Sequence, residues 1–218
     1  MKIGVIGIGM LGEAIVLNLL NLGQDVAVYN RTKEKTMRVE NNGAKVMDSP
    51  KAVAENTELV IIVVKDAIAV REVSFGEKGI VESKNKKPII ADMSTIDAEE
   101  SKKIAEEFQR NDIKKIEIPV MGGPNVAITG KLVMMASGPK SSFDYCKPIF
   151  EKIANKILFL GEQGIANSIK LAMNLQITML ALSLSEGITL LKKLNVDPKI
   201  FLEVLNSTYF KTGMSENK

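Results

Sequence analysis

The feature that most constrains the fold of this chain is a glycine-rich turn between an apolar segment and a helical pattern near the N-terminus. The turn reads Gly7-Ile8-Gly9-Met10-Leu11-Gly12, a G-x-G-x-x-G pattern. The apolar segment Lys2–Ile8 predicts a buried strand, and the pattern of Met10–Leu22 predicts a helix that stops at Gly23. A strand, a tight glycine turn and a helix in this order begin a βαβ unit. The chain is therefore expected to contain a parallel sheet covered by helices.

Strand-like and helix-like segments go on alternating as far as Leu160. We expect further strands at Asp25–Tyr29, Lys45–Met47, Leu59–Val64, Pro88–Asp92, Ile113–Ile118, Lys131–Ala136 and Lys156–Leu160. We expect helices after Tyr29 through Asn41, with Gly43 as the cap, and at Pro50–Asn56, Asp97–Arg110 and Ser141–Ile153. Alternation with short connections predicts the α/β class, as a Rossmann-type, doubly wound parallel sheet.

The pattern changes after Gly161. Ile165–Leu191 predicts one long helix and Asp197–Leu205 a second, and the polar residues after them are expected to be frayed. We therefore expect a Rossmann domain over residues 1–163 and a small, incomplete all-α domain over residues 164–218, because two helices bury little core alone.

The composition excludes several classes of protein. The chain has 29 basic and 26 acidic residues and a net charge of +3, and no basic stripe interleaved with aromatic residues, so we expect no nucleic-acid partner. The basic run 84–87 is interpreted as a solvated loop before a strand. With one cysteine and no histidine, the chain lacks the ligands of a Cys/His zinc site and any histidine acid–base. We expect no metal site.

The single cysteine and the apolar segments bear on location. One cysteine makes no disulfide within the chain, which is compatible with a reducing cytoplasm, and Cys146 is interpreted as structural. The uncharged stretch Leu171–Ser185 contains several polar residues and is too short to span a bilayer. We therefore expect a cytoplasmic protein with no membrane partner.

The glycine-rich turn predicts a dinucleotide site. In that interpretation Gly7 permits the tight turn, Gly9 lets the backbone approach a pyrophosphate, and Gly12 allows close helix–strand packing. The helix that starts at Met10 and Leu11 then offers free N–H groups to phosphate. The alternative is a purely structural glycine turn.

The end of the second strand bears on which dinucleotide is bound. NAD sites usually place Asp or Glu there, whereas this chain has Asn30, Arg31 and Thr32. A guanidinium beside a hydroxyl suits a 2′-phosphate, so NADP is favoured over NAD. The alternative is that Arg31 only caps a loop.

Three further segments follow predicted strands and should line one crevice, since ligands bind at the carboxyl ends of such strands. They are Val64-Lys65-Asp66, Met93-Ser94-Thr95 and Pro119–Pro124. Ser94 and Thr95 offer hydroxyls, and Gly122 and Gly123 expose N–H groups suited to a carboxylate. The alternative for each loop is ordinary turn chemistry.

One lysine stands out in the predicted long helix. From Gly164 to Leu191 the charged residues are Lys170 and Glu186, and Asn174 lies one turn after the lysine, on the same helix face. A lysine in so apolar a stretch is costly unless it meets a partner, a cavity or a substrate. The alternative is a lysine that snorkels to water.

These motifs together resemble the β-hydroxyacid dehydrogenase family, which includes 3-hydroxyisobutyrate dehydrogenases and glyoxylate/succinic semialdehyde reductases. The matching segments are the glycine turn, Asn30-Arg31-Thr32, Met93-Ser94-Thr95, Pro119-Val120-x-Gly122-Gly123 with Ala127 and Gly130, and Gly161-x-x-Gly164 followed by Lys170 and Asn174. The resemblance covers essentially the whole chain.

The resemblance implies roles for individual residues. Lys170 would be the catalytic acid–base, with Asn174 holding the substrate beside it. Thr95 would lie near the nicotinamide, and Val64 and Lys65 would belong to the cofactor loop. Gly122 and Gly123 would bind the substrate carboxylate, and Ser94 and Met121 would also contact the substrate.

Two positions depart from the family pattern. Met121 stands where the family usually has a serine before the paired glycines, and Val64-Lys65 stands where it often has Leu-Pro. Family members also continue for several more helices, with a further lysine that has no counterpart here. Either this C-terminal part was removed or lost, or another subunit covers the apolar helix. We expect the helix to form an interface, in a homodimer or higher homo-oligomer through the C-terminal helices.

The resulting hypothesis is an NADP-dependent oxidoreductase that interconverts a small β-hydroxyacid and its semialdehyde or keto acid. The alternative is a catalytically weak or inactive NADP-binding relative that acts as a partner or scaffold module. Imine-reducing relatives are disfavoured, because those generally replace the lysine.

Overall fold

The computed structural model describes residues 1–84 and 87–216 of the chain, which fall into two compact units, Met1–Lys170 and Leu171–Lys218. The division lies within a helix, seven residues after the boundary predicted at 163. The predicted solvated loop at 84–87 includes Asn85 and Lys86, which lie outside the described residues.

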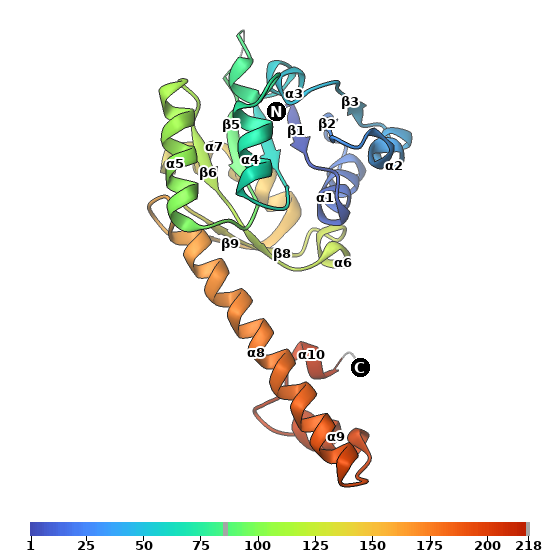
Figure 1. Ribbon diagram of the computed structural model, residues 1–218. Coiled ribbons are helices and arrows are strands. Elements are labelled where there is room, and N and C mark those ends of the chain that lie inside the picture. The colour runs from blue at the N-terminus through green and yellow to red at the C-terminus, as the bar shows by residue number, and fades with distance from the viewer. Residues whose placement is uncertain (85–86, 217–218) are drawn as a thin grey trace. The chain divides into compact units, whose positions relative to one another are not determined.

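The first unit is built on a six-stranded parallel sheet in the order β3-β2-β1-β4-β5-β6 (Figure 1). Its strands are β1 (Ile3–Ile6), β2 (Val26–Tyr29), β3 (Lys45–Val46), β4 (Leu59–Ile62), β5 (Ile89–Asp92) and β6 (Lys115–Glu117). The order reverses between β1 and β4, where open α/β sheets bind their ligands. The prediction of a Rossmann-type α/β fold is confirmed.

Helices cover both faces of this sheet. On one face α1 (Met10–Asn21) and α7 (Lys140–Ile153) pack in one core cluster, and on the other face α3 (Pro50–Asn56), α4 (Ala67–Phe75) and α5 (Ala98–Arg110) pack in a second. All four residues of β4 are buried, as is expected for a central strand covered on both faces. The short elements η1 (Lys33–Thr36), α2 (Met37–Asn41) and η2 (Ile80–Glu82) lie between the larger ones.

Two expectations about the helices were wrong. The segment expected as one charged helix through Asn41 is a 3-10 turn followed by the short α2. The sequence prediction also missed α4, which begins after Asp66. The Asp66 carboxylate accepts a hydrogen bond from the backbone N–H of Ala69 and so caps this helix.

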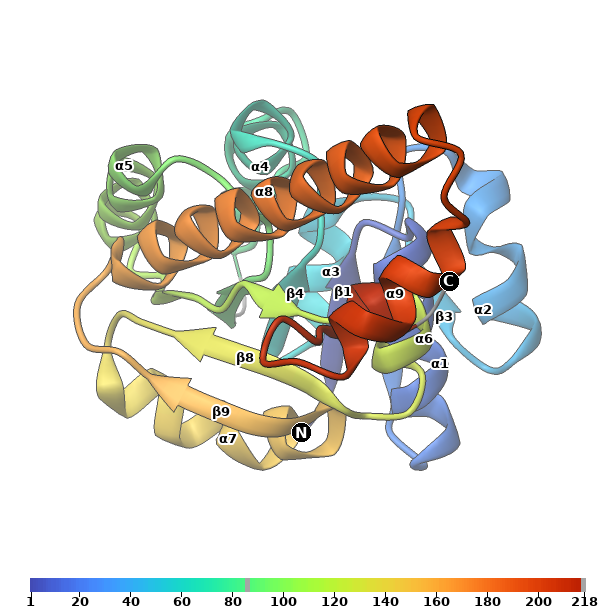
Figure 2. The same cartoon turned by 90° about the horizontal axis from the view of Figure 1, so that it is seen from below.

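The strands after β6 leave the parallel sheet, which corrects the expectation of one continuous sheet. They form a second sheet in the order β7-β8-β9, from β7 (Val120–Met121), β8 (Leu132–Ala136) and β9 (Ala154–Phe159). In it β7 is antiparallel to β8, and α7 packs along β9 (Figure 2). The chain passes between the sheets at Pro119, which has no backbone N–H to donate to a ladder. The short helix α6 (Pro124–Ala127) follows β7.

The second unit is helical. It contains α8 (Ile165–Lys193), which begins in the first unit, together with α9 (Pro198–Asn206) and α10 (Gly213–Glu216). We expected the residues after Leu205 to be frayed, but through Glu216 they are held in place: the Ser215 hydroxyl donates a 2.6 Å hydrogen bond to Asn206 Oδ1, and α10 packs against α9.

By length and composition, α8 is a helix that could cross a membrane. The uncharged stretch Leu171–Ser185, which is too short to span a bilayer, is about half of this helix. Apolar helices of proteins outside membranes meet the same criterion, so this property alone is weak evidence of a span.

Candidate active site

The glycine-rich turn has the close contacts that the motif requires. Gly7 has a φ of +100°, and a Cβ placed on it would lie 2.1 Å from the Val63 carbonyl oxygen. A Cβ on Gly12 would lie 2.0 Å from the Gly7 carbonyl oxygen. A Cβ on Gly9, by contrast, would meet nothing within 4 Å. The turn is therefore tight on its inner side and leaves open space at Gly9.

The start of α1 leaves backbone donors free of side-chain caps. Gly9 is the N-cap residue and supplies no side-chain hydrogen bond, while Met10 is 81% exposed and Leu11 packs against the core. An uncapped helix N-terminus beside open space carries partial positive charge and N–H donors. These features fit the pyrophosphate of a dinucleotide.

Asn30 ties the glycine turn to the end of β2. Its Oδ1 accepts a 2.9 Å hydrogen bond from the N–H of Ile8, and its Nδ2 donates a 2.7 Å bond to the Thr32 carbonyl. Both ends of the amide are thus engaged with backbone, so in this structure Asn30 shapes the turn.

A cleft of about 300 Å³ opens between the glycine turn and the ends of β2 and β4. It brings together seven of the residues predicted to bind cofactor: Gly7, Gly9, Asn30, Arg31, Thr32, Val64 and Lys65. Within it the Arg31 guanidinium lies 3.3 Å from the Glu72 carboxylate, and both side chains are largely exposed. An exposed ion pair of this kind is worth about 1 kcal/mol or less, so a phosphate can displace it at small cost. Lys65 pairs with Asp66 at 3.2 Å.

The loop after β5 is less open than predicted. Ser94 is 2% exposed, and its hydroxyl accepts a 3.1 Å hydrogen bond from the N–H of Val64. Thr95 is half-buried. In this structure the Ser94 hydroxyl therefore joins the loops after β4 and β5.

The loop between β7 and α6 presents its paired glycines to solvent. Gly122 has a φ of +119° and is exposed, and Gly123 is the exposed N-cap residue of α6. Met121, the residue before them, is half-buried.

Lys170 reaches this loop from α8. Its Nζ lies 3.2 Å from the Met121 thioether sulfur, and the side chain is half-buried. A thioether is a weak acceptor and carries no charge, so it does not compensate the ammonium. Burial accordingly lowers the pKa of Lys170 from its ordinary value of 10.5. Asn174 lies one turn further along α8, within the second unit.

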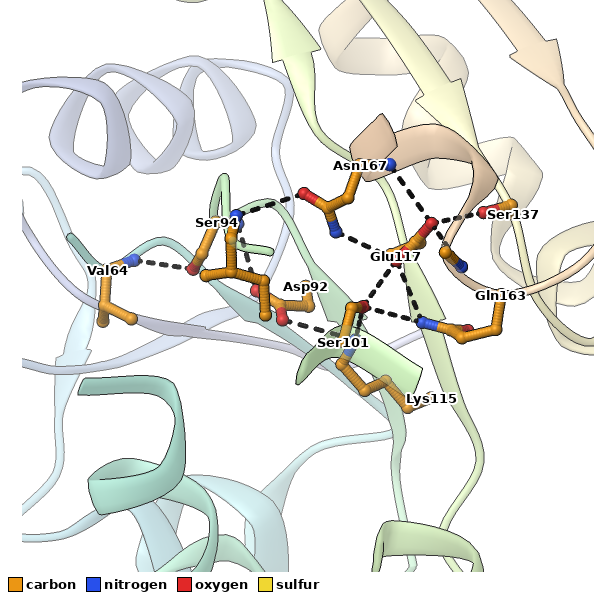
Figure 3. A network of polar contacts seen from close by, with 11 residues as sticks. Val64, Asp92, Ser94, Ser101, Lys115, Glu117, Ser137, Gln163 and Asn167 are labelled. Atoms are coloured by element: carbon orange, nitrogen blue, oxygen red, sulfur yellow. Dashed lines mark hydrogen bonds and ion pairs between the residues drawn. The ribbon is translucent and has the colours of Figure 1, made fainter. Parts of the chain in front are cut away.

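The sequence analysis missed a buried polar network that holds the start of α8 (Figure 3). At its centre is Glu117 on β6, which is fully buried. Its Oε1 accepts hydrogen bonds from the Ser137 hydroxyl at 2.6 Å and from the N–H groups of Gly164 and Asn167 at 2.8 and 3.2 Å. The carboxylate thus caps the N-terminus of α8 from another element.

The second oxygen of Glu117 is equally engaged. Oε2 accepts from the Ser101 hydroxyl at 2.5 Å, the Asn167 Nδ2 at 2.9 Å and the Gln163 Nε2 at 3.2 Å. Burial alone raises the pKa of Glu117, but the hydrogen bonds from Ser101, Ser137 and Asn167, with the charge of Lys115, outweigh it and hold the pKa below 4.5.

A buried ion pair adjoins this carboxylate. Lys115 Nζ lies 3.4 Å from Asp92 Oδ2, with both side chains fully buried, and donates a 3.1 Å hydrogen bond to the Ser101 hydroxyl. Asp92 Oδ1 accepts from the N–H of Ser94 at 3.0 Å. A sequence signal existed: Lys115 and Glu117 alternate with apolar residues, so they share one face of β6.

The remaining polar candidates do not suggest a metal centre. Among residues 1–84 and 87–216, no three His, Cys, Asp or Glu side chains gather as a set of metal ligands. Cys146 is buried and free, and burial raises its pKa to about 12, which agrees with a structural role.

A dinucleotide-type turn beside a cleft, on a doubly wound parallel sheet, and an amine beside a second glycine loop fit an oxidoreductase of the Rossmann type. Residues 2–161 match the family described as the NAD binding domain of 6-phosphogluconate dehydrogenase. The chain belongs to this family, among the NAD(P)-dependent hydroxyacid dehydrogenases and reductases, and the predicted family is confirmed.

Individual relatives agree with this assignment. The chain is 33% identical over 210 residues to a Bacillus subtilis (strain 168) protein named "Uncharacterized oxidoreductase YfjR", covering 96% of this chain and 73% of that protein. It is 32% identical over 206 residues to glyoxylate/succinic semialdehyde reductase 1 of Arabidopsis thaliana, covering 94% and 71%. The structure of Psf3 in complex with NADP+ and 2-OPP superposes with a TM-score of 0.91 at 25% identity, covering 98% and 76%.

Proposed function

We propose that this chain is an NADP-dependent reductase of a small aldehyde or keto acid, reversible to the β-hydroxyacid, with Lys170 as the acid–base. The observation that carries this proposal is the position of the Lys170 amine, 3.2 Å from Met121 in the loop of Gly122 and Gly123. The family supplies the class of reaction, and this geometry supports the assignment of its proton transfer to Lys170.

Each residue of the proposed site has a distinct role in the reaction. Bound NADPH supplies a hydride to the carbonyl carbon of the substrate. Lys170, as the ammonium, donates a proton to the carbonyl oxygen, and in the reverse direction the neutral amine accepts it. The backbone N–H groups of Gly122 and Gly123 bind the substrate carboxylate, and Asn174 holds the substrate beside the amine. Met121, beside the paired glycines, and Ser94, in the loop after β5, complete the proposed substrate site.

The preference for NADP rests on charge at the end of β2. Arg31, Thr32 and Lys35 line the cleft there, and a guanidinium with an adjacent hydroxyl suits a 2′-phosphate. The glycine turn with Met10 and Leu11, the Asn30 link, the loop of Val64 and Lys65, and Thr95 would hold the rest of the cofactor. NADP+ is also the dinucleotide in the complex of the structural relative Psf3.

The apolar side chains of the helical unit support an oligomer. Leu175, Leu190 and Leu194 are each about 60% exposed on or just after α8. Such a surface favours a homodimer or higher homo-oligomer formed through the C-terminal helices.

We also propose that the protein acts in the cytoplasm, that residues 1–163 hold the cofactor, and that residues 164–218 serve substrate binding and assembly.

The test replaces Lys170 by alanine. NADPH binding is measured by fluorescence, and turnover with glyoxylate, succinic semialdehyde and methylmalonate semialdehyde. We expect turnover by the wild type, a loss of about 10² to 10⁴-fold in Lys170→Ala, and nearly unchanged NADPH affinity. Added ethylamine should restore part of the loss. Lys156→Ala, on the exposed edge of β9, is the matched control.

Two outcomes would contradict the proposal. NADPH binding by the wild type without turnover of any of these substrates would favour the alternative, a catalytically weak or inactive cofactor-binding module. Full turnover by Lys170→Ala would remove the lysine from the mechanism.

A further inference from the structure

We propose that Glu117 is a positioning residue for the reaction: its buried carboxylate caps the start of α8 and thereby sets the place of the Lys170 amine over the substrate loop. This inference rests on the proposed function of Lys170. It concerns a residue that touches neither the cofactor cleft nor the glycine loop, and that acts through the helix it holds.

The capping contact is strong because it joins opposite charges in a buried place. Lys115 forms its ion pair with Asp92 and acts on Glu117 only at longer range, so the N-terminus of α8 is the positive group in direct contact with Glu117. A helix N-terminus carries about half a positive charge, and its first N–H groups have no partners inside the helix. Glu117 Oε1 accepts hydrogen bonds from the N–H groups of Gly164 and Asn167. One charged oxygen therefore both neutralises the partial charge of the helix N-terminus and provides partners for two of its N–H groups.

Neighbouring groups hold the same helical turn from the same side. The Ser137 hydroxyl donates to Glu117 and accepts a 3.1 Å hydrogen bond from the N–H of Ala166. Asn167 donates to Glu117 through Nδ2, and its Oδ1 accepts a 3.2 Å hydrogen bond from the N–H of Ile96. The first turn of α8 is therefore bound to the segments after β5 and β8 as well as to β6.

Lys170 follows this clamped turn directly. It lies three residues after Asn167, which is about 4.5 Å along the helix axis. Lys170 is also the last residue of the first unit. A small rotation or shift of the first turn therefore also displaces the Lys170 amine, because few residues lie between them.

Strand β6 also leads into the loop that Lys170 contacts. Glu117 ends β6, and four residues later Met121 contacts Lys170 just before Gly122 and Gly123. One short segment therefore holds both the helix that carries the amine and the loop proposed for the carboxylate. Because displacements near 1 Å can cost about 10²-fold in rate, this shared attachment is a means of keeping the geometry.

An amide cannot replace the carboxylate in this place. Each oxygen of Glu117 accepts three hydrogen bonds. In Glu117→Gln the remaining oxygen can stay with the backbone N–H groups of Gly164 and Asn167, and the new NH₂ then faces the Asn167 Nδ2 donor. The Asn167 amide cannot turn around without losing the hydrogen bond from Ile96 N–H to its Oδ1. The variant retains the volume of the side chain while it releases part of the first turn of α8.

The experiment measures the environment of Lys170 independently of turnover. In the full chain, the pH dependence of Lys170 acetylation by limiting acetic anhydride is followed by peptide mass spectrometry, together with hydrogen exchange over 164–170. In Glu117→Gln we expect the midpoint of Lys170 modification to rise toward that of an exposed lysine and amide exchange to speed up. We expect kcat to fall by about 10 to 100-fold with little change in NADPH affinity.

Three further variants keep the test decisive. Ile80→Val removes one methyl group in the core cluster that contains α3, α4 and α5, and controls for lost stability alone. Ser137→Ala keeps the charge of Glu117 and removes one bond to it and one to Ala166, so it serves if Glu117→Gln does not fold. Glu117→Asp, which retains the charge, should recover part of the rate.

The outcomes separate this proposal from the proposed function. If the wild type shows no turnover, the function fails, and the modification and exchange measurements still decide whether Glu117 positions Lys170. If folded Glu117→Gln or Ser137→Ala matches Ile80→Val in Lys170 modification, exchange and kcat, the positioning role is refuted.

Discussion

Replacing Lys115 by methionine tests the energetics of the buried network. The Lys115 and Asp92 side chains are fully buried, and Lys115 Nζ lies 3.4 Å from Asp92 Oδ2. The other contact of the Asp92 carboxylate within the described residues is the N–H of Ser94. Methionine matches the length and volume of lysine, so little cavity is created. The change leaves an uncompensated buried carboxylate, which typically costs about 3 to 5 kcal/mol. For a chain of this size we expect Tm to fall by about 6 to 20 °C.

The measurement is the free energy of unfolding in urea. The chain has no tryptophan, so unfolding is followed by far-ultraviolet circular dichroism. Wild type, Lys115→Met, Asp92→Asn and the double variant form a cycle. Lys115→Met leaves the buried Asp92 charge without its partner, and Asp92→Asn removes that charge. The double variant should therefore be more stable than the sum of the two changes predicts, by about 1 to 3 kcal/mol.

Lys114→Met is the matched control, since Lys114 is the exposed neighbour on the chain. It should change the free energy of unfolding by about 0.5 kcal/mol or less. The reasoning is refuted if Lys115→Met costs no more than Lys114→Met, or if the cycle shows no coupling.

Three further predictions concern charge and pH. Arg31→Asp should weaken NADPH binding far more than NADH binding, and exposed Arg110→Asp should change neither; equal losses for both dinucleotides would show that Arg31 does not bind the 2′-phosphate. The lowered pKa of Glu117 means that its contribution to stability is complete above pH 4.5 and is lost as pH falls through the lowered pKa. The free energy of unfolding should therefore fall in that acid range in the wild type and fall less steeply in Glu117→Gln. Because burial lowers the pKa of Lys170, oxidation of the hydroxyacid should gain rate as pH rises, with a midpoint below 10.5. A midpoint at or above that of an exposed lysine would contradict the half-buried position of the amine.

Local patterns were sufficient to predict most of the first sheet. Leu59–Ile62 is an uninterrupted apolar run and forms the central strand, and the Gly7–Gly12 turn lies where strand and helix patterns meet. Both signals come from residues that are adjacent in the chain, so they can be recognised from a single sequence. The helix Pro50–Asn56 was predicted to the residue, because Ser49 caps it and Pro50 suits its first turn.

Other features depend on residues far apart in the chain. The partners of Glu117 come from three segments, around Ser101, around Ser137 and over residues 163–167, and no local pattern indicates that they meet. The second sheet depends on how the chain turns after β6, which strand propensity does not specify. Lys170 could be singled out because it interrupts an apolar stretch, but its contact with Met121 required the three-dimensional arrangement.

The division of the chain at Lys170 has a consequence for redesign. The cofactor cleft, the paired glycines, the Glu117 clamp and the amine all belong to Met1–Lys170, while Leu171 begins a separate module. We therefore expect that exchanging the module that begins at Leu171 for that of another relative, in helical register, alters substrate choice and assembly without disturbing Lys170, the proposed proton donor. The chain can in this way serve as a fixed redox platform on which different recognition modules are compared.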